Sequence, residues 1–376
     1  MNSKNNIKTS DFLALAFKIP NISSLSFANA IKFSLNKQGF NIAKMGFLGT
    51  LDPFACGQLL LASNTYTRLL NHINVAYKTY RATLFLGLNS ASLDSENVER
   101  VDILKPFSVE QICSVLDSIN DKILEYEPPK FSAKQINGQR AYNLARKGVS
   151  FNIQHIKTHI KNVDLLNYCH PFLSFEITLS SGGYVRSVGD LIAGGLGVCG
   201  ALCYLERVSE DDFCYLDSIK SMESLESGRQ DSIKSLESSF VSKDFGIDSK
   251  LDSIISTNFN FQGINYPTKL AILNIESALK YDKINLAKYE KDALCGKKIK
   301  LDSKDFNLDS IESNSQELGF IESNRKNVDV SLLLNMTNKI DSIESKRFLA
   351  DFNSHFSIID IHKNGEIKYI LNNIKK

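Results

Sequence analysis

The sequence lacks the features that mark several large classes of protein. After Asp11 the first apolar run covers only Phe12 to Phe17, which is too short for a secretory signal, and no stretch approaches the ~18 apolar residues of a membrane span. The seven cysteines are dispersed, and no second pair with nearby histidine completes a metal site around the closest two, Cys199 and Cys203. No Gly-x-Gly-x-x-Gly or Walker loop is present. The dispersed cysteines suit buried thiols in a reducing compartment, and we expect a cytoplasmic protein.

A strong excess of charge is also missing, since the formal net charge is only +2. Its distribution is uneven. Residues 1–209 hold 21 Lys and Arg against 15 Asp and Glu, and the remainder holds 23 against 27. A mildly basic first half permits a polyanionic partner without requiring one.

The composition and the apolar periodicity of the chain change near residue 216. Beyond it the pattern Asp-Ser-Ile-x-Ser occurs five times, beginning at Asp217, Asp231, Asp252, Asp309 and Asp341. The irregular spacing excludes a solenoid, which needs a fixed period. Ser/Asp/Glu-rich segments bury little apolar surface, so we expect solvated insertions, with a protein-docking role as the alternative.

Apolar periodicity and turn signals predict an interleaved order of helices and strands in the first half. Helices are expected over 27–36 with Ser26 as the cap, over 64–71, over 108–117 with Ser108 as the cap, and from about 185. Strands are expected over 57–62, 79–86 and 173–179, the last with clean alternation. These patterns indicate an α+β domain with a mixed, mainly antiparallel sheet.

The second half has two apolar segments, 269–301 and 347–374, which read as short strands with turns at Gly296 and Asn364-Gly365. We place a first domain at 1–209, a low-complexity linker at 210–262, and a small β-rich domain at 263–376 with an insert at 302–346.

The loop Lys44-Met-Gly-Phe-Leu-Gly-Thr-Leu-Asp-Pro-Phe-Ala-Cys-Gly carries the first candidate for chemistry, Asp52. Its glycines permit left-handed backbone, and Pro53 restricts the chain just after the carboxylate. A carboxylate on a rigid turn can act as a nucleophile or base. The alternative is an Asx-type turn without chemistry.

Two further positions stand out. Tyr80 shares a face of its expected strand with Ala82 and Leu84, so its ring points inward, either to a site or simply to the core. Arg186 falls in the first turn of its expected helix, where the helix dipole disfavours a cation. Such an arginine calls for a compensating anion, and Asp52 or an RNA phosphate could serve; an exposed arginine remains the alternative.

The segment 128–148 has five cations, two aromatic residues and no acidic residue. The cations are Lys130, Lys134, Arg140, Arg146 and Lys147, with Phe131 and Tyr142 among them. This composition suits RNA through phosphate contacts and stacking, although a solvated basic surface is equally consistent with it.

Together these motifs resemble, in order over residues 12–209, the TruB family of tRNA pseudouridine synthases. Gly49-Thr-Leu-Asp-Pro-Phe-Ala-x-Gly is similar to the family signature, which makes Asp52 the match to its catalytic nucleophile. Tyr77-Lys-Thr-Tyr-Arg matches Tyr80 to the tyrosine that stacks on the target base. Gly183-Tyr-Val-Arg matches Arg186 to the arginine that pairs with the catalytic Asp, and Tyr204-Leu-Glu-Arg matches Leu205 to a leucine of the uracil pocket. Residues 128–148 are similar to the mobile RNA-binding thumb, and the C-terminal region more loosely to a PUA-like domain.

The resemblance implies isomerisation of uridine-55 in the T-loop of tRNAs to pseudouridine, by base flipping and Asp-dependent cleavage and re-formation of the glycosidic bond. It implies the tRNA T-arm as partner, and we expect a monomer with no metal, cofactor or membrane contact. Arg186 is expected to hold the pKa of Asp52 low. The alternatives are a non-catalytic RNA-binding or RNA-folding protein on the same scaffold, or a synthase for another RNA uridine.

The chain departs from the family pattern at Phe47, where a histidine is usual. Phe47 is expected either to stack on a base of the substrate or only to pack the loop against the domain. The N-terminal Lys18-Ile-Pro-Asn-Ile-Ser-Ser also departs from the usual Lys-Pro-x-Gly-x-Ser-Ser.

Overall fold

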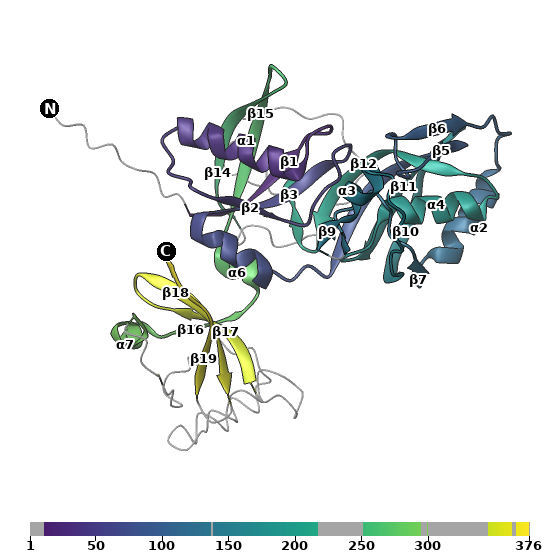
Figure 1. Ribbon diagram of the computed structural model, residues 1–376. Coiled ribbons are helices and arrows are strands. Elements are labelled where there is room, and N and C mark those ends of the chain that lie inside the picture. Colours follow the sequence, from purple (N-terminus) through teal and green to yellow (C-terminus); the bar gives the residue numbers. More distant parts are fainter. Residues whose placement is uncertain are drawn as a thin grey trace, which may run out of the picture.

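One large mixed sheet organises the protein (Figure 1). The computed structural model describes residues 11–136, 138–216, 251–294, 299, 345–362 and 366–375. The strand order is β14 (Leu251–Phe261), β15 (Ile264–Leu273), β1 (Leu13–Lys18), β3 (Cys56–Ser63), β12 (Gly200–Glu210), β4 (Tyr77–Leu86), β11 (Phe172–Ser180), β10 (Ile156–Cys169) and β7 (Lys122–Tyr126). Two short strands, β2 (Met45–Leu48) and β13 (Phe213–Cys214), pair with β3 and β12. Within this sheet β12 and β3 pair in parallel and the other pairs are antiparallel, which confirms the α+β prediction.

The helices cover this sheet with one apolar face each. In α1 (Ser24–Lys37), Phe27, Ile31 and Leu35 recur every four residues and are fully buried. The helix begins earlier than predicted, because Ser23 rather than Ser26 accepts the capping hydrogen bond. In α2 (Val109–Ile119), Ser108 forms a capping box, so the predicted cap is confirmed. The predicted helices near 64 and 185 are the 3-10 helix η1 (Asn64–His72) and α4 (Val185–Gly195).

The central strands show why alternation predicted them well. Along β11, Leu173, Phe175 and Ile177 are fully buried while the residues between them are half-exposed. Tyr80, Ala82 and Leu84 do the same along β4. Their inner faces form one core with α2 and α4, and this core forms the wall that carries the site.

The hairpin β14–β15 differs from the expected domain boundaries. We placed residues 251–262 in the linker and 263–273 in the C-terminal domain, but the structure pairs β15 with β1 and so joins both strands to the large sheet. Phe259 packs against Phe27 of α1 with ring centroids 5.3 Å apart. The repeat copy that begins at Asp252 therefore lies within a strand, because its two isoleucines add apolar surface that the sheet partly buries.

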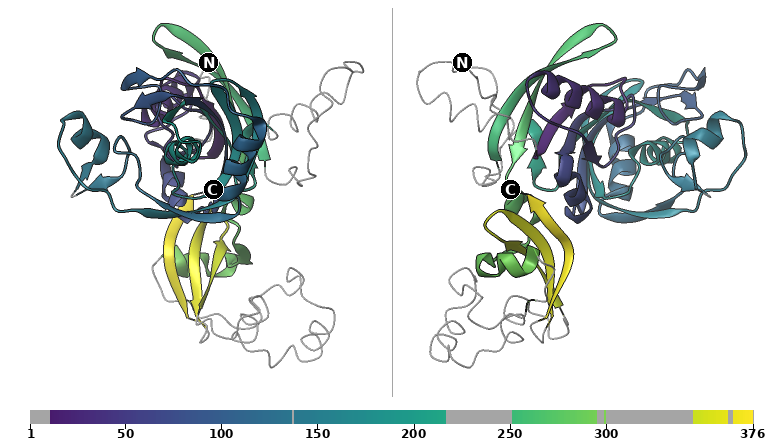
Figure 2. Two further views of the ribbon diagram at one scale, coloured as in Figure 1. Left: turned by 90° about the vertical axis from the view of Figure 1, so that its right-hand side faces the viewer. Right: turned by 60° about the vertical axis from the view of Figure 1, so that its left-hand side comes forward.

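The C-terminal region forms a second sheet in the order β16 (Asp282–Asn285), β17 (Ser345–Asp351), β18 (His355–His362) and β19 (Ile367–Lys375). Figure 2 shows it beside the end of the large sheet. The expectation of strands throughout 269–301 was wrong in part, because α6 (Ile275–Leu279), η2 (Ala287–Tyr289) and α7 (Glu290–Leu294) lie there. Asn274 caps α6 by accepting two backbone hydrogen bonds, which explains the helix. Tyr66 of η1 packs edge-on against Phe356, so the two sheets share a core.

Four of the five Asp-Ser-Ile-x-Ser copies, and the turns expected at Gly296 and Asn364-Gly365, lie outside the described residues. We predict that deleting residues 221–250 leaves the melting temperature and the turnover nearly unchanged, because their Ser/Asp/Glu-rich sequence offers little apolar surface for burial. Differential scanning fluorimetry and a turnover assay on the deletion variant would check this. An insoluble or inactive variant would contradict the prediction.

Candidate active site

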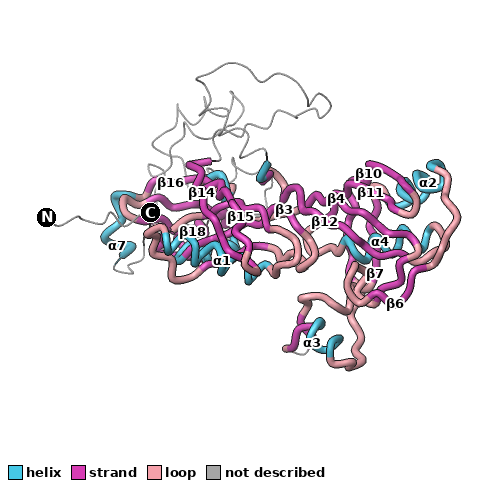
Figure 3. Tube along the Cα trace, turned by 90° about the horizontal axis from the view of Figure 1, so that it is seen from above, coloured by secondary structure: helices cyan, strands magenta, loops and turns pink. Residues whose placement is uncertain are grey.

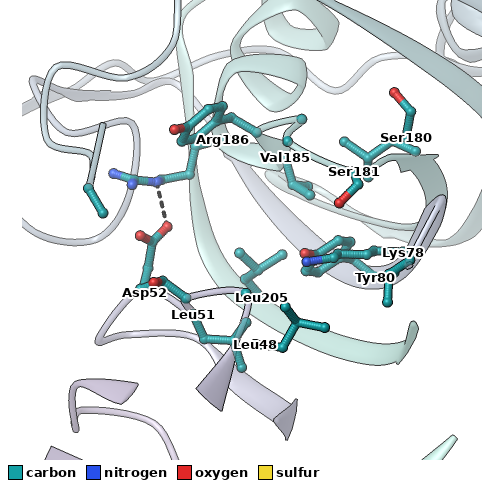
Figure 4. A pocket seen from close by; sticks show the side chains of 18 of the residues that line it. Leu48, Leu51, Asp52, Lys78, Tyr80, Ser180, Ser181, Val185, Arg186 and Leu205 are labelled. Carbon is teal, nitrogen blue, oxygen red and sulfur yellow. Dashed lines mark ion pairs between the residues drawn. The ribbon is translucent and has the colours of Figure 1, made fainter. Parts of the chain in front are cut away.

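A pocket of about 680 Å³ opens where the β2–β3 loop, β4 and the start of α4 meet. Figure 4 shows the side chains that line it. They include Leu48, Leu51, Asp52, Lys78, Tyr80, Lys134, Arg140, Val185, Arg186 and Leu205. The structure thus brings together six predicted residues, four of them from four separate motifs and two from the basic segment.

Asp52 and Arg186 point toward each other at one side of the pocket (Figure 4). The Arg186 Nε lies 2.9 Å from the Asp52 Oδ2, and the guanidinium is 3% exposed while the carboxylate is 31% exposed. Arg186 stands in the first turn of α4, as predicted, where the dipole disfavours a cation. The carboxylate supplies the compensating anion, so Arg186 orients Asp52 while leaving it accessible to a ligand.

A second carboxylate, Asp94, shares this arginine. Its Oδ2 lies 3.0 Å from the Arg186 Nη1, and the side chain is buried. Ser92 donates a hydrogen bond to Asp94, which fixes the loop that carries both. We did not predict Asp94 as a site residue, because no local pattern distinguishes it from other loop aspartates. The available signal was indirect: a buried guanidinium has five donors and needs more than one acceptor.

Arg186 also donates two hydrogen bonds to backbone carbonyls. Nη1 donates to the carbonyl of Ser92 at 2.8 Å, and Nη2 donates to the carbonyl of Phe131 at 3.0 Å. Arg186 therefore connects the catalytic candidate Asp52 to the base of the segment 128–148.

The pKa of the Asp52 carboxyl is raised above its ordinary value, chiefly because burial disfavours the charged form. The Arg186 guanidinium acts in the opposite direction, and the nearby negative charge of Asp94 raises the pKa further. Our expectation that Arg186 keeps this pKa low is therefore corrected: the arginine lowers it, but burial has the larger effect.

The loop that carries Asp52 is held from both sides. The Ser24 hydroxyl donates to the carbonyl of Leu51 and accepts from its backbone amide, at 3.0 and 2.9 Å. The buried Lys18 ammonium donates to the carbonyl of Pro53 at 3.3 Å. At Gly49 the backbone has φ +64°, which favours glycine. These contacts make the turn rigid, as its sequence suggested.

Tyr80 and Leu205 form the apolar wall. Both are buried in the main core, and both also line the pocket. Burial raises the pKa of the Tyr80 hydroxyl, so this ring remains neutral. A flat ring and a branched aliphatic side chain suit a planar base.

The predicted basic segment divides into two groups. It comprises β8 (Gln135–Ile136), β9 (Gln139–Arg140) and α3 (Ala141–Arg146), which project from the body in Figure 3. Lys134 and Arg140 line the pocket, whereas Lys130, Arg146 and Lys147 do not. Those three are exposed on the same segment, where Arg146 lies over the Tyr142 ring. The group that lines the pocket can contact the same ligand as Asp52.

Phe47 is not among the residues that line the pocket. It lies half-buried on β2, opposite Leu61 of β3, and packs against the α1 core. This placement favours the packing alternative over base stacking.

We predict that Phe47→Ala lowers stability by about 1–3 kcal/mol, because it removes a partly buried ring, while RNA affinity stays within about threefold. Phe47→Leu keeps most of the apolar volume and is the matched control. Thermal melts and filter binding on the same samples would check this. A stable Phe47→Ala variant with about tenfold weaker RNA binding would support stacking instead.

Among the described residues, no group of three or more His, Cys, Asp or Glu side chains gathers in the manner of a metal site. No helix in the described part of the chain is both long and apolar enough to cross a membrane.

A carboxylate paired with a buried arginine, in a pocket that is also lined by Tyr80, Leu205 and two basic side chains, is suited to chemistry on a base of a nucleic acid. The family model described as TruB family pseudouridylate synthase (N terminal domain) matches residues 37–185. The tRNA pseudouridine synthase B of Helicobacter hepaticus is 49% identical over 53% of this chain and 68% of its own length. That of Sulfurimonas denitrificans is 45% identical over 57% of this chain and 79% of its own. The chain belongs to the TruB family of pseudouridylate synthases.

One solved structure, a Cbf5-Nop10-Gar1 complex, has a chain that aligns with a TM-score of 0.42 and 20% identity. The alignment covers 55% of this chain and 51% of that one. So distant a likeness carries no argument about function.

Proposed function

We propose that this protein isomerises a uridine of tRNA to pseudouridine, and that the uridine is position 55 in the T-loop. The Asp52–Arg186 pair in the pocket is the observation that carries the proposal. Family membership and the relatives named tRNA pseudouridine synthase B support the substrate class. The proposal includes a monomer in the cytoplasm, where dispersed thiols remain reduced.

The reaction breaks the bond between N1 of the base and C1′ of the ribose, lets the base turn, and joins C5 to C1′. C5 loses its proton and N1 gains one, so that overall no atom or electron is gained or lost. Asp52 acts in its ionised form, and Arg186 favours that form against burial. The target base leaves its stack, at a cost of roughly a few kcal/mol, and enters the pocket. There Tyr80 and Leu205 hold the detached ring, because both present apolar surface that the core keeps in place.

The projecting segment 128–148 supplies cations for the RNA backbone. Lys134 and Arg140 contact the RNA near the flipped base, since they line the pocket. Lys130, Arg146 and Lys147 extend this contact along the T-arm. Arg186 joins the base of the segment through the Phe131 carbonyl, so RNA bound by the segment also bears on the catalytic ion pair.

The test is to incubate the purified protein with an unmodified tRNA transcript and map pseudouridine by position. Pseudouridine at position 55, and its loss from a transcript with cytidine there, would support the proposal. Modification at another position would overturn the assignment to uridine 55. Binding without any modification would favour a non-catalytic RNA-binding protein.

A further inference from the structure

A second ionic cluster adjoins the pocket and consists of Lys78, Arg207 and Glu210. Lys78 and the neighbouring Gly49 belong to the pocket wall. The Glu210 Oε1 lies 3.2 Å from the Lys78 Nζ and 3.5 Å from the Arg207 Nη1. The side chains of Glu210 and Arg207 are 1% and 0% exposed, and that of Lys78 is 13% exposed. The register between β12 and β4 produces this cluster, because it pairs Glu210 with Lys78 and Arg207 with Tyr80.

Arg207 is committed to the backbone. Both of its terminal nitrogens donate to the carbonyl of Gly49 at 3.0 Å, and its Nε donates to the carbonyl of Gln58 at 2.9 Å. Gly49 passes so close that a Cβ there would lie 2.5 Å from the Lys78 Nζ and 3.2 Å from the Glu210 Oε1. Arg207 thus fixes the start of the loop that carries Asp52.

Lys78 differs from Arg207 and Glu210 in that it lines the pocket and they do not. Two cations share one carboxylate oxygen, so the cluster carries one positive charge that Glu210 does not neutralise. Asp211 is also near, but its two carboxylate oxygens accept from the backbone amides of Ala76 and Tyr77. A half-buried excess cation is costly unless an anion compensates it.

Glu210 favours the charged state of this lysine. Burial lowers the pKa of Lys78, and Glu210 is the strongest influence in the opposite direction. The Glu210 carboxylate also holds the Lys78 ammonium close to Gly49. Both Lys78 and Glu210 lie on strands of the main sheet, β4 and β12. Lys134 and Arg140 reach the pocket from the projecting segment, whereas Lys78 is part of its rigid wall.

We propose that Lys78 binds a backbone phosphate of the RNA beside the flipped nucleotide, and that Glu210 positions its ammonium group for this contact. The proposal rests on the proposed function for its ligand. Uracil is neutral, so the anion that an RNA brings to this wall is a phosphodiester. The Asp52 carboxylate already has Arg186, which leaves Lys78 for the incoming charge.

The experiment measures binding of a T-arm stem-loop RNA in which each loop phosphate in turn is a neutral methylphosphonate. For the wild-type protein, neutralising one particular linkage should raise Kd by roughly tenfold or more, the effect of a lost charge-assisted hydrogen bond. Lys78→Met should raise the Kd for the native RNA by a similar factor. In this variant, neutralising the same linkage should not raise Kd any further. For Lys78→Met, the slope of log Kd against log salt concentration should be smaller than that of the wild type by about 0.7, which is the value for one phosphate contact on a single strand.

Two variants separate positioning from general stability. Lys37→Met removes an exposed lysine of α1 that does not line the pocket, and it should keep the wild-type profile. In Glu210→Gln, neutralising the same linkage should raise Kd by less than it does in the wild type, while the other RNA contacts are kept. The single-turnover rate of this variant at saturating protein should change by a smaller factor than its Kd. A purely structural role of Glu210 would lower stability and leave the linkage profile intact.

The outcomes also separate this proposal from the proposed function, because binding is measured without turnover. RNA binding with the expected coupling but no pseudouridine would overturn the function and support the phosphate contact. A pseudouridine-forming protein in which no linkage is coupled to Lys78 would overturn the phosphate contact alone. Wild-type protein that does not bind the RNA would overturn both.

Discussion

Asp52→Asn is expected to abolish pseudouridine formation while RNA affinity falls by less than about tenfold, ~1.4 kcal/mol. The substitution keeps the shape of the side chain and removes only its charge and its nucleophilic or basic oxygen. Arg186 retains Asp94 and two backbone carbonyls as partners, so the loop and the pocket should remain in place. The measurement is a single-turnover assay at saturating protein, with Kd determined on the same sample.

The matched control is Asp117→Asn, which neutralises an exposed aspartate on α2 that does not line the pocket. It should react and bind like the wild type. Near wild-type turnover in Asp52→Asn would reject Asp52 as the catalytic carboxylate. A variant that loses affinity and melts much earlier would instead assign Asp52 to the structure of the turn.

The strands and helices of the first half were predictable because their patterns are local. The alternation that predicted β11 is the alternation of buried and half-exposed residues in the sheet, and the capping box at Ser108 is complete within four residues. The hairpin β14–β15 was not predictable in this way, because its place depends on pairing with β1 more than 200 residues earlier. Nothing in a local window marks which sheet a strand joins.

The site shows the same division. Asp52, Tyr80 and Arg186 stand in recognisable motifs, and the dipole argument at Arg186 predicted that an anion would face it. Asp94 and Glu210 were missed, since each owes its role to a buried cation on a distant strand or helix. The net direction of the Asp52 pKa was also missed, because burial is a property of the folded pocket.

Arg186→Gln tests the shared arginine, and its expected effects on rate and stability have opposite pH dependence. The substitution leaves Asp52 and Asp94 near each other without their cation. Loss of the opposite charge raises the pKa of the Asp52 carboxyl further, in the same direction as burial and the nearby Asp94 charge. In the proposed mechanism the ionised form of Asp52 reacts, so the acid limb of the rate profile should move to higher pH, and activity should partly recover as pH rises.

The stability of Arg186→Gln should fall as pH rises, whereas its rate should increase. A carboxyl whose pKa is higher in the folded than in the unfolded state binds more protons when folded, so the folded state is favoured as pH falls between the two values and loses stability as pH rises. Breaking a buried ion pair also costs about 3–5 kcal/mol. The melting temperature of Arg186→Gln should therefore lie below that of the wild type and fall further with rising pH, over the range in which its activity increases. Adding Asp94→Asn removes one of the two unpaired charges, and the double variant should regain stability and move the acid limb partly back. Rate and stability that fall together at every pH would show that Arg186 only holds the fold together.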